Sequence, residues 1–132
     1  MSQYENGLYS YIEGRLMPLE RAGKCYFFRN NSFSGRIMRY DGSQGFIKNN
    51  KRGTPDVVAC FYTEEQQDNA DQFMGDFFTS FGLFVGFELK TKTGRQSPEQ
   101  KLAQKAIEDA GGKYYIIRTP EEFEEVLKEL CG

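Results

Sequence analysis

The segment FVGFELKTKTGRQSPEQK, residues 84–101, begins as an apolar run and then places Glu88 and Lys90 two residues apart. An apolar run of this kind is typical of a buried strand, where an unpaired charge is costly. Residues two apart on a strand point to the same side of a sheet, so the two charges project together. Ser97 and Pro98 then have the residue types of a helix start. The segment predicts a strand that ends in charged side chains and leads into a helix.

Hydrophobic periodicity and turn residues predict the other elements of the chain. We expect helices over residues 4–22, 97–112 and 119–130, and strands over residues 25–29, 54–62, 83–91 and 113–118. The polar segment 64–72 is interpreted as a loop, GFIK (45–48) as a brief strand, and the aromatic segment 73–82 as either a short helix or a hairpin edge. The order αβββαβα, without an internal repeat or linker, predicts an α/β fold in one domain spanning residues 1–132.

The composition limits the cellular compartment in which we expect the protein and the reaction mechanisms that it can use. The chain has 132 residues with 39% apolar content, which suits one globular domain with a modest core. Its N-terminus, MSQYENGLYSYI, lacks the layout of a signal peptide, and no apolar run approaches the length of a membrane span. We therefore expect a cytoplasmic protein whose three cysteines are reduced. The chain has no histidine, which excludes mechanisms that need an imidazole base and argues against a zinc site.

Charge is distributed unevenly along a chain whose net charge is −2. The segment between residues 29 and 52 contains one acid, Asp41, and a set of basic side chains: Arg29, Arg36, Arg39, Lys48, Lys51 and Arg52. The charged residues from Glu121 onward are mostly acidic. A basic segment with aromatic, Asn and Ser neighbours suits contact with phosphates in spite of the acidic total. The alternative is a solvated loop that happens to be basic.

Asp56 lies near the start of the predicted strand before the one that carries Glu88 and Lys90. If these strands are neighbours, two carboxylates and an amine converge. Carboxylates without competing His or Cys suit a hard cation such as Mg²⁺ or Mn²⁺, which polarises phosphoryl oxygens and lowers the pKa of bound water. Lys90 would position or deprotonate that water, or neutralise charge on the phosphate. The pattern favours a metal-dependent phosphodiesterase, and the alternative is an ordinary ion pair between Glu88 and Lys90.

Three motifs stand in one order: GTPD (53–56), ELK (88–90) and GRQSPEQ (94–100), followed by a helix ending in GG and the strand YYIIR. Together they resemble a stand-alone virus-type replication-repair nuclease domain (VRR-NUC) of the PD-(D/E)XK nuclease superfamily, of the phage or bacterial type and similar to Holliday-junction resolvases. RNNSFSG (29–35) resembles the arginine-asparagine stretch that members often carry after the first strand. The resemblance covers nearly the whole chain.

The chain departs from the family pattern in two places. The connection between strands 54–62 and 83–91 is longer than the family's usual hairpin, and the loop over residues 30–52 is long. Neither departure removes a motif. The resemblance implies a PD-(D/E)XK core, with a mixed central sheet flanked by helices.

The same resemblance implies an activity. It makes the protein an Mg²⁺- or Mn²⁺-dependent DNA endonuclease that hydrolyses phosphodiester bonds, in a bacterial or phage-infected cell. Stand-alone members are expected to be homodimers that act on branched DNA, such as four-way junctions. The alternative is a nucleic-acid-binding module or partner subunit that has kept the fold without catalysis.

Carried over position by position, the resemblance assigns the roles in the site. Asp56 and Glu88 would be the metal-binding carboxylates, Leu89 would offer its backbone carbonyl to the ion, and Lys90 would be the catalytic lysine. Gln100 would support the water or the hydration of the metal. Gln100 also has a structural interpretation, because it lies three residues after Ser97, at the position of a capping box.

The family also has a glutamate on its first helix, and Glu5 and Glu13 compete for this position. At about 100° per residue, Glu5 lies at the centre of the apolar stripe and one turn before it begins, whereas Glu13 lies on its flank. Leu8, Ile12, Leu16 and Leu19 form that stripe. We therefore assign Glu5 to the site. Its alternative role is a negative charge favourably placed at a helix N-terminus.

Donors suited to a DNA backbone surround these motifs. We expect them to contact DNA: Arg29, Asn30, Asn31, Ser32, Lys48, Lys51, Arg52, Lys92 and Arg95.

Overall fold

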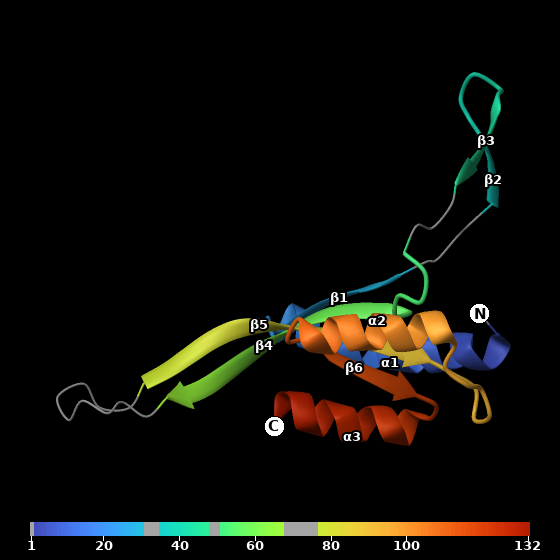
Figure 1. The fold of residues 1–132 in the computed structure, drawn as a ribbon. Helices are drawn as coiled ribbons and strands as arrows, with labels where there is room; N and C mark the ends of the chain where they lie inside the picture. The colour runs from blue at the N-terminus through green and yellow to red at the C-terminus, as the bar shows by residue number, and fades with distance from the viewer. Residues whose placement is uncertain (1, 31–34, 48–50, 68–76) are drawn as a thin grey trace.

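The structure of the protein is a computed structural model that describes residues 2–30, 35–47, 51–67 and 77–132 (Figure 1). Three residues predicted to bind DNA, Asn31, Ser32 and Lys48, lie outside these ranges. So do residues 68–72 of the predicted loop and residues 73–76 of the ambiguous aromatic segment.

A four-stranded mixed sheet in the order β1–β4–β5–β6 forms the centre of the fold. Its strands are β1 (Cys25–Arg29), β4 (Val57–Gln67), β5 (Phe77–Leu89) and β6 (Lys113–Ile117). β4 pairs antiparallel with both β1 and β5, whereas β5 and β6 are parallel. A parallel pair needs a crossover connection, and α2 (Pro98–Asp109) supplies it. The predicted α/β class with a mixed central sheet is confirmed.

Two helices cover one face of this sheet. α1 (Gln3–Arg21) and α3 (Pro120–Cys131) contact each other and the sheet strands. Leu8, Ile12 and Leu16 of α1 join Phe123 and Leu127 of α3 in the core. The sheet contributes alternate residues to the same core: Val57, Ala59, Phe61, Val85, Phe87 and Leu89. This face therefore holds the main hydrophobic core.

The third helix, α2, lies on the opposite face. Its Leu102 and Ala106 line a cavity of about 730 Å³ together with Val58 of β4 and Phe84 of β5. None of the residues of α2 is fully buried. The sheet is thus covered tightly on one face and loosely on the other.

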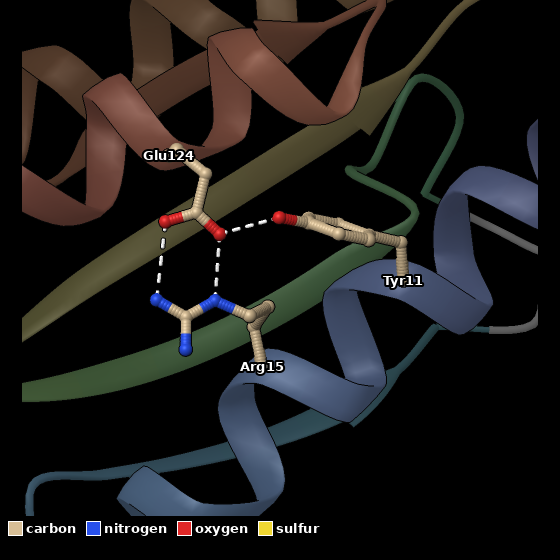
Figure 2. A network of polar contacts seen from close by, with 3 residues as sticks. All are labelled: Tyr11, Arg15 and Glu124. Carbon is tan, nitrogen blue, oxygen red and sulfur yellow. Dashed lines mark hydrogen bonds and ion pairs between the residues drawn. The ribbon is translucent and has the colours of Figure 1, made fainter.

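Figure 2 shows the polar contact that joins α1 to α3. The carboxylate of Glu124 accepts hydrogen bonds from the hydroxyl of Tyr11 at 2.6 Å and from Nε and Nη2 of Arg15 at 2.6 and 3.1 Å. The hydrogen bonds from Arg15 and then Tyr11 lower the pKa of Glu124 to about 2. Because these groups are exposed, the contact adds little stability and serves mainly to orient the two helices.

The structure corrects the strand count. The predicted order had three strands between the first two helices, whereas the structure has five, because β2 (Gly35–Met38) and β3 (Gln44–Ile47) form a separate antiparallel pair. The brief strand at GFIK corresponds to β3, and β2 was not predicted. Residues 64–67, interpreted as loop, belong to β4, and residues 77–82 form a hairpin edge in β5 rather than a helix.

Sequence patterns miss strands of this kind because pairing in a hairpin satisfies the backbone hydrogen-bonding groups even where the side chains are polar. Glu64 and Glu65 pair with Ser80 and Thr79 in the β4–β5 ladder, although neither glutamate is buried. Hydrophobic periodicity reports burial and therefore misses strands that extend beyond the core. No helix within the described ranges is long and apolar enough to cross a membrane.

Candidate active site

Pairing of β4 with β5 brings Asp56 and Glu88 to one end of the sheet. Val57 pairs with Phe87, so Asp56, just before Val57, and Glu88, just after Phe87, come opposite each other. Oδ2 of Asp56 accepts a hydrogen bond of 2.8 Å from the backbone N–H of Leu89. The neighbouring strands on which the predicted convergence depended are therefore present.

Among the residues that the structure describes, Glu88 is the only charged residue that is buried, with 3% of its surface exposed. Its Oε1 accepts a hydrogen bond of 2.7 Å from Nε2 of Gln100, and its Oε2 accepts one of 3.4 Å from the hydroxyl of Tyr114. Burial and then the charge of Asp56 raise the pKa of Glu88 to about 8. The pair therefore holds a proton near neutral pH when no cation is bound.

Asp56 is affected in the same direction. Burial raises its pKa, and the charge of Glu5 adds to this effect. The N–H of Leu89, a hydrogen bond with Glu88 and the charge of Lys90 act the other way. Two carboxyl groups with raised pKa values in contact are typical of sites that bind a cation or transfer protons.

Lys90 and Glu5 belong to the same electrostatic cluster. The ammonium of Lys90 lowers the pKa of Asp56, Glu88 and Glu5. Burial raises the pKa of Glu5, but its hydrogen bonds with Ser2 outweigh burial and the pKa is lowered overall. Glu5 thus lies near the carboxyl pair, as expected, and also forms a capping box with Ser2 at the start of α1. Glu13 instead accepts a hydrogen bond from the hydroxyl of Tyr9 at 3.1 Å.

Gln100 combines the two roles that the sequence left open. Its Oε1 accepts a hydrogen bond of 2.8 Å from the N–H of Ser97, and its own N–H donates to Oγ of Ser97 at 3.1 Å, which completes a capping box. The nitrogen of the same side-chain amide, Nε2, donates a hydrogen bond to Glu88. The start of α2 is therefore connected directly to the carboxyl pair.

The loop before Asp56 is fixed by Asn30 and Gly53. Nδ2 of Asn30 donates to Oγ1 of Thr54 at 2.9 Å and to the carbonyl of Pro55 at 3.1 Å, and the N–H of Asn30 donates to the carbonyl of Asp56 at 2.8 Å. Gly53 has φ of 78° and lies so close to the backbone of Glu99 that a Cβ atom would collide with it. This loop therefore packs against the start of α2, and Gly53 serves that contact.

The other predicted DNA-binding residues that the structure describes lie on several elements near this centre. Arg29 donates to Oδ1 of Asn6 at 2.7 Å and lies over the ring of Tyr9, 4.5 Å from its centroid. Lys51 and Arg52 line the cavity beneath α2. Lys92 and Arg95 are exposed in the connection between β5 and α2. The amide of Asn30 is used within the protein, so its side chain positions Asp56 in this structure.

Tyr114 was missed by the sequence interpretation, although it contacts Glu88. It is buried in β6, opposite Gly86, and it forms a further hydrogen bond with Gln96. Burial raises its pKa above the usual range, which keeps the hydroxyl protonated as a donor. The signal in the sequence was the alternation of residues 113–118, which places Tyr114 and Ile116 on one face.

The oxygen donors of this centre fit a hard divalent cation. Within the described ranges there is no group of three or more His, Cys, Asp and Glu side chains arranged for a metal ion. The fit rests instead on the contact between buried Glu88 and partly buried Asp56, whose pKa values are both raised, and on a chain without histidine. A cation would replace the proton and relieve the repulsion between the two carboxylates.

Comparison with protein-family models, with curated proteins and with solved structures finds no match to this chain.

Proposed function

We propose that the protein is a metal-dependent DNA endonuclease with a PD-(D/E)XK core. One observation supports this proposal above all: Asp56, Glu88, Lys90 and Gln100 come from three separate motifs of the sequence and form one interacting cluster. These are the positions at which the chain resembles the VRR-NUC motifs. The β2–β3 pair is then an addition to that core.

Two carboxylates would hold the metal, Mg²⁺ or Mn²⁺, together with the backbone carbonyl of Leu89. Such an ion supplies Lewis acidity toward a phosphoryl oxygen and lowers the pKa of bound water. Gln100 donates to one oxygen of Glu88 and Tyr114 to the other, which fixes the carboxylate before a ligand arrives. Asp56 is fixed in the same way by the N–H of Leu89.

Lys90 stabilises the negative charge that develops during the reaction. Its ammonium lies close enough to all three acids of the cluster to lower their pKa values. A phosphodiester that enters this centre gains negative charge as water attacks it, and a fixed ammonium stabilises that charge. Lys90 also orients the attacking water through its N–H donors.

A catalytically inactive nucleic-acid-binding module is the alternative. The burial of Glu88 beside Asp56 argues against it, because a binding module gains nothing from a buried carboxyl group whose pKa is raised by burial and by the charge of Asp56. We further propose that the active protein is a homodimer that cuts branched DNA in a bacterial or phage-infected cell. The exposed apolar part of the sheet supports the dimer.

The test compares three variants on supercoiled plasmid with Mn²⁺ or EDTA. We expect Asp56→Asn and Glu88→Gln to abolish cleavage, weaken Mn²⁺ binding in calorimetry and lose the rise in melting temperature on adding Mn²⁺. Lys90→Ala should still bind Mn²⁺ but fail to cut. In EDTA the two carboxyl variants should melt at or slightly above the temperature of the wild type, because like-charge repulsion is removed. Cleavage by either carboxyl variant would contradict the proposal.

A further inference from the structure

The β2–β3 pair forms an arm, defined here as residues 35–47, that stands apart from the rest of the described protein. Arg36 pairs with Phe46 and Met38 with Gln44 in its antiparallel ladder. In the described part of the chain, neither strand contacts any other helix or strand. Figure 1 shows the arm projecting beyond the end of β1, away from α3.

This arm exposes large apolar side chains that contribute nothing to the core. Tyr40 near the turn is fully exposed, and Met38 and Phe46 expose 76% and 65% of their surfaces. Two-stranded hairpins have little stability of their own, so such side chains are not explained by folding. Exposed apolar groups gathered on one element indicate a surface that binds something.

The charge of the arm indicates the class of partner. Its acid, Asp41, is used in the turn, where Oδ1 accepts hydrogen bonds from the N–H and hydroxyl of Ser43 at 2.9 and 2.6 Å. Arg39 donates to the carbonyl of Gln44 at 3.0 Å and packs over Gly45, where a Cβ would collide with its guanidinium. Arg36 is exposed on the same face as Phe46. An exposed arginine beside aromatic rings suits phosphates and bases.

The arm is inserted directly between two parts of the candidate active site. Asn30, which positions Asp56, precedes it in the chain, and Lys51 and Arg52, which line the cavity beneath α2, follow it. A polynucleotide held at Asp56 and Glu88 is many times longer than one phosphodiester. The DNA strands that leave the site therefore pass within reach of the arm, because both ends of the arm are connected to the site.

We propose that the arm binds nucleic acid beside the nuclease site, with Arg36 on a phosphate and with Tyr40 and Phe46 against unpaired bases. The inference rests on the proposed function for the position of the scissile phosphate, and it extends that function by naming a substrate class. The class is DNA that has unpaired bases next to a duplex. Fully paired DNA keeps its bases stacked, so the aromatic side chains gain little from it.

The experiment measures binding separately from cleavage. Fluorescein-labelled DNA with a single-stranded flap, and a fully paired duplex of the same length, are titrated in EDTA and followed by anisotropy. Tyr40→Ala, Phe46→Ala and Arg36→Ala are compared with Met17→Ala and Arg21→Ala, which change exposed residues of α1. Because all five positions are exposed, thermal melts should match the wild type.

We expect Tyr40→Ala and Phe46→Ala each to weaken flap binding about tenfold and to leave duplex binding nearly unchanged. Arg36→Ala should weaken binding to both and flatten the log–log salt slope by about 0.7 to 0.9. The α1 variants should bind as the wild type does. Arm variants with unchanged affinity and salt slope would overturn the proposal.

Two further measurements distinguish this proposal from the proposed nuclease function and from a role of the arm in dimerisation. If the wild type fails to cut plasmid in Mn²⁺ but the arm variants still lose flap binding, the arm binds nucleic acid and the proposed nuclease function is wrong. If sedimentation shows that Tyr40→Ala or Arg36→Ala turns a dimer into a monomer, and flap affinity per protomer is unchanged, the arm binds a second copy of the chain. That result would overturn the nucleic-acid assignment.

Discussion

Glu88 makes the stability of the metal-free protein depend on pH. Its folded-state pKa of about 8 lies above the ordinary value of 4.5 because it is buried beside Asp56. Between these two values the folded protein keeps a proton that the unfolded chain releases, so the free energy of unfolding falls as pH rises. The contribution is complete below 4.5 and is lost as pH rises through about 8.

Thermal melts in EDTA test this dependence. We expect the melting temperature to fall from pH 4.5 toward pH 8 and Glu88→Gln to flatten that fall, because the amide does not titrate. One proton contributes at most about 1.4 kcal/mol per pH unit. Glu65→Gln, at an exposed position in β4, is the matched control and should follow the wild type. An unchanged slope in Glu88→Gln would place the titration elsewhere.

Residue type and spacing predicted those site residues whose chemistry is unusual for their surroundings. Glu88 and Lys90 could be recognised because charges at the end of an apolar strand need a reason. Gln100 was assigned to the site only through the family resemblance, because its capping-box position by itself indicates a structural role. Tyr114 could not be recognised in this way. An aromatic residue in an aromatic strand fits the core equally well, and only the register of β6 against β5 brings its hydroxyl to Glu88.

The start of α2 allows the two roles of Gln100 to be separated by mutation. Ser97→Ala removes the capping hydroxyl but leaves the contact between Gln100 and Glu88. We expect it to cost about 1 kcal/mol of stability, typical of a lost N-cap, with little change in Mn²⁺ affinity. Gln100→Ala keeps the backbone N–H that donates to Ser97 but removes the side-chain hydrogen bonds to the N–H of Ser97 and to Glu88, so it should also weaken Mn²⁺ binding.

Chemical denaturation and calorimetric Mn²⁺ titration of both variants measure the difference. Thr119→Ala is the matched control, since Thr119 caps α3 by accepting from the N–H of Glu122 at 3.1 Å, away from the carboxyl pair. Equal Mn²⁺ affinities for Ser97→Ala and Gln100→Ala would mean that the contact with Glu88 does not support the metal site.

Elements with a buried face were predicted well, and elements without one were not. The three helices and the core halves of the four sheet strands follow from apolar periodicity and caps. β2 and the outer parts of β4 and β5 have no such pattern in the sequence. Backbone groups pair β2 with β3, and they pair the outer part of β4 with that of β5. The departure from the family pattern at residues 30–52 did mark where the arm lies.

The whole molecule has an uneven distribution of apolar surface. Register places Tyr26 and Phe28 of β1 on the same sheet face as Phe84 of β5, the face on which α2 lies, and all three remain exposed. An apolar face of this kind on one side of a sheet is typical of a protein–protein interface. It is where we expect the second protomer of the proposed homodimer to bind.

Sedimentation velocity checks this expectation. The wild type should be a dimer at micromolar concentration, and Phe28→Asp should shift it toward monomer, because a buried charge at an interface lacks a partner. Met17→Asp, on the exposed side of α1, is the control and should not change the molecular mass in solution. A monomeric wild type would contradict the dimer.

The loose packing of α2 against the sheet has a consequence for local unfolding of this protein. Opening of a segment costs least where few apolar contacts hold it, and α2 has no fully buried residue. Its departure would remove Gln100 from Glu88 and uncover the loop at Gly53, while α1, α3 and the sheet kept their common core. The arrangement around the carboxyl pair is therefore held by the least protected helix of the fold, and it can be lost from a chain that is otherwise still folded.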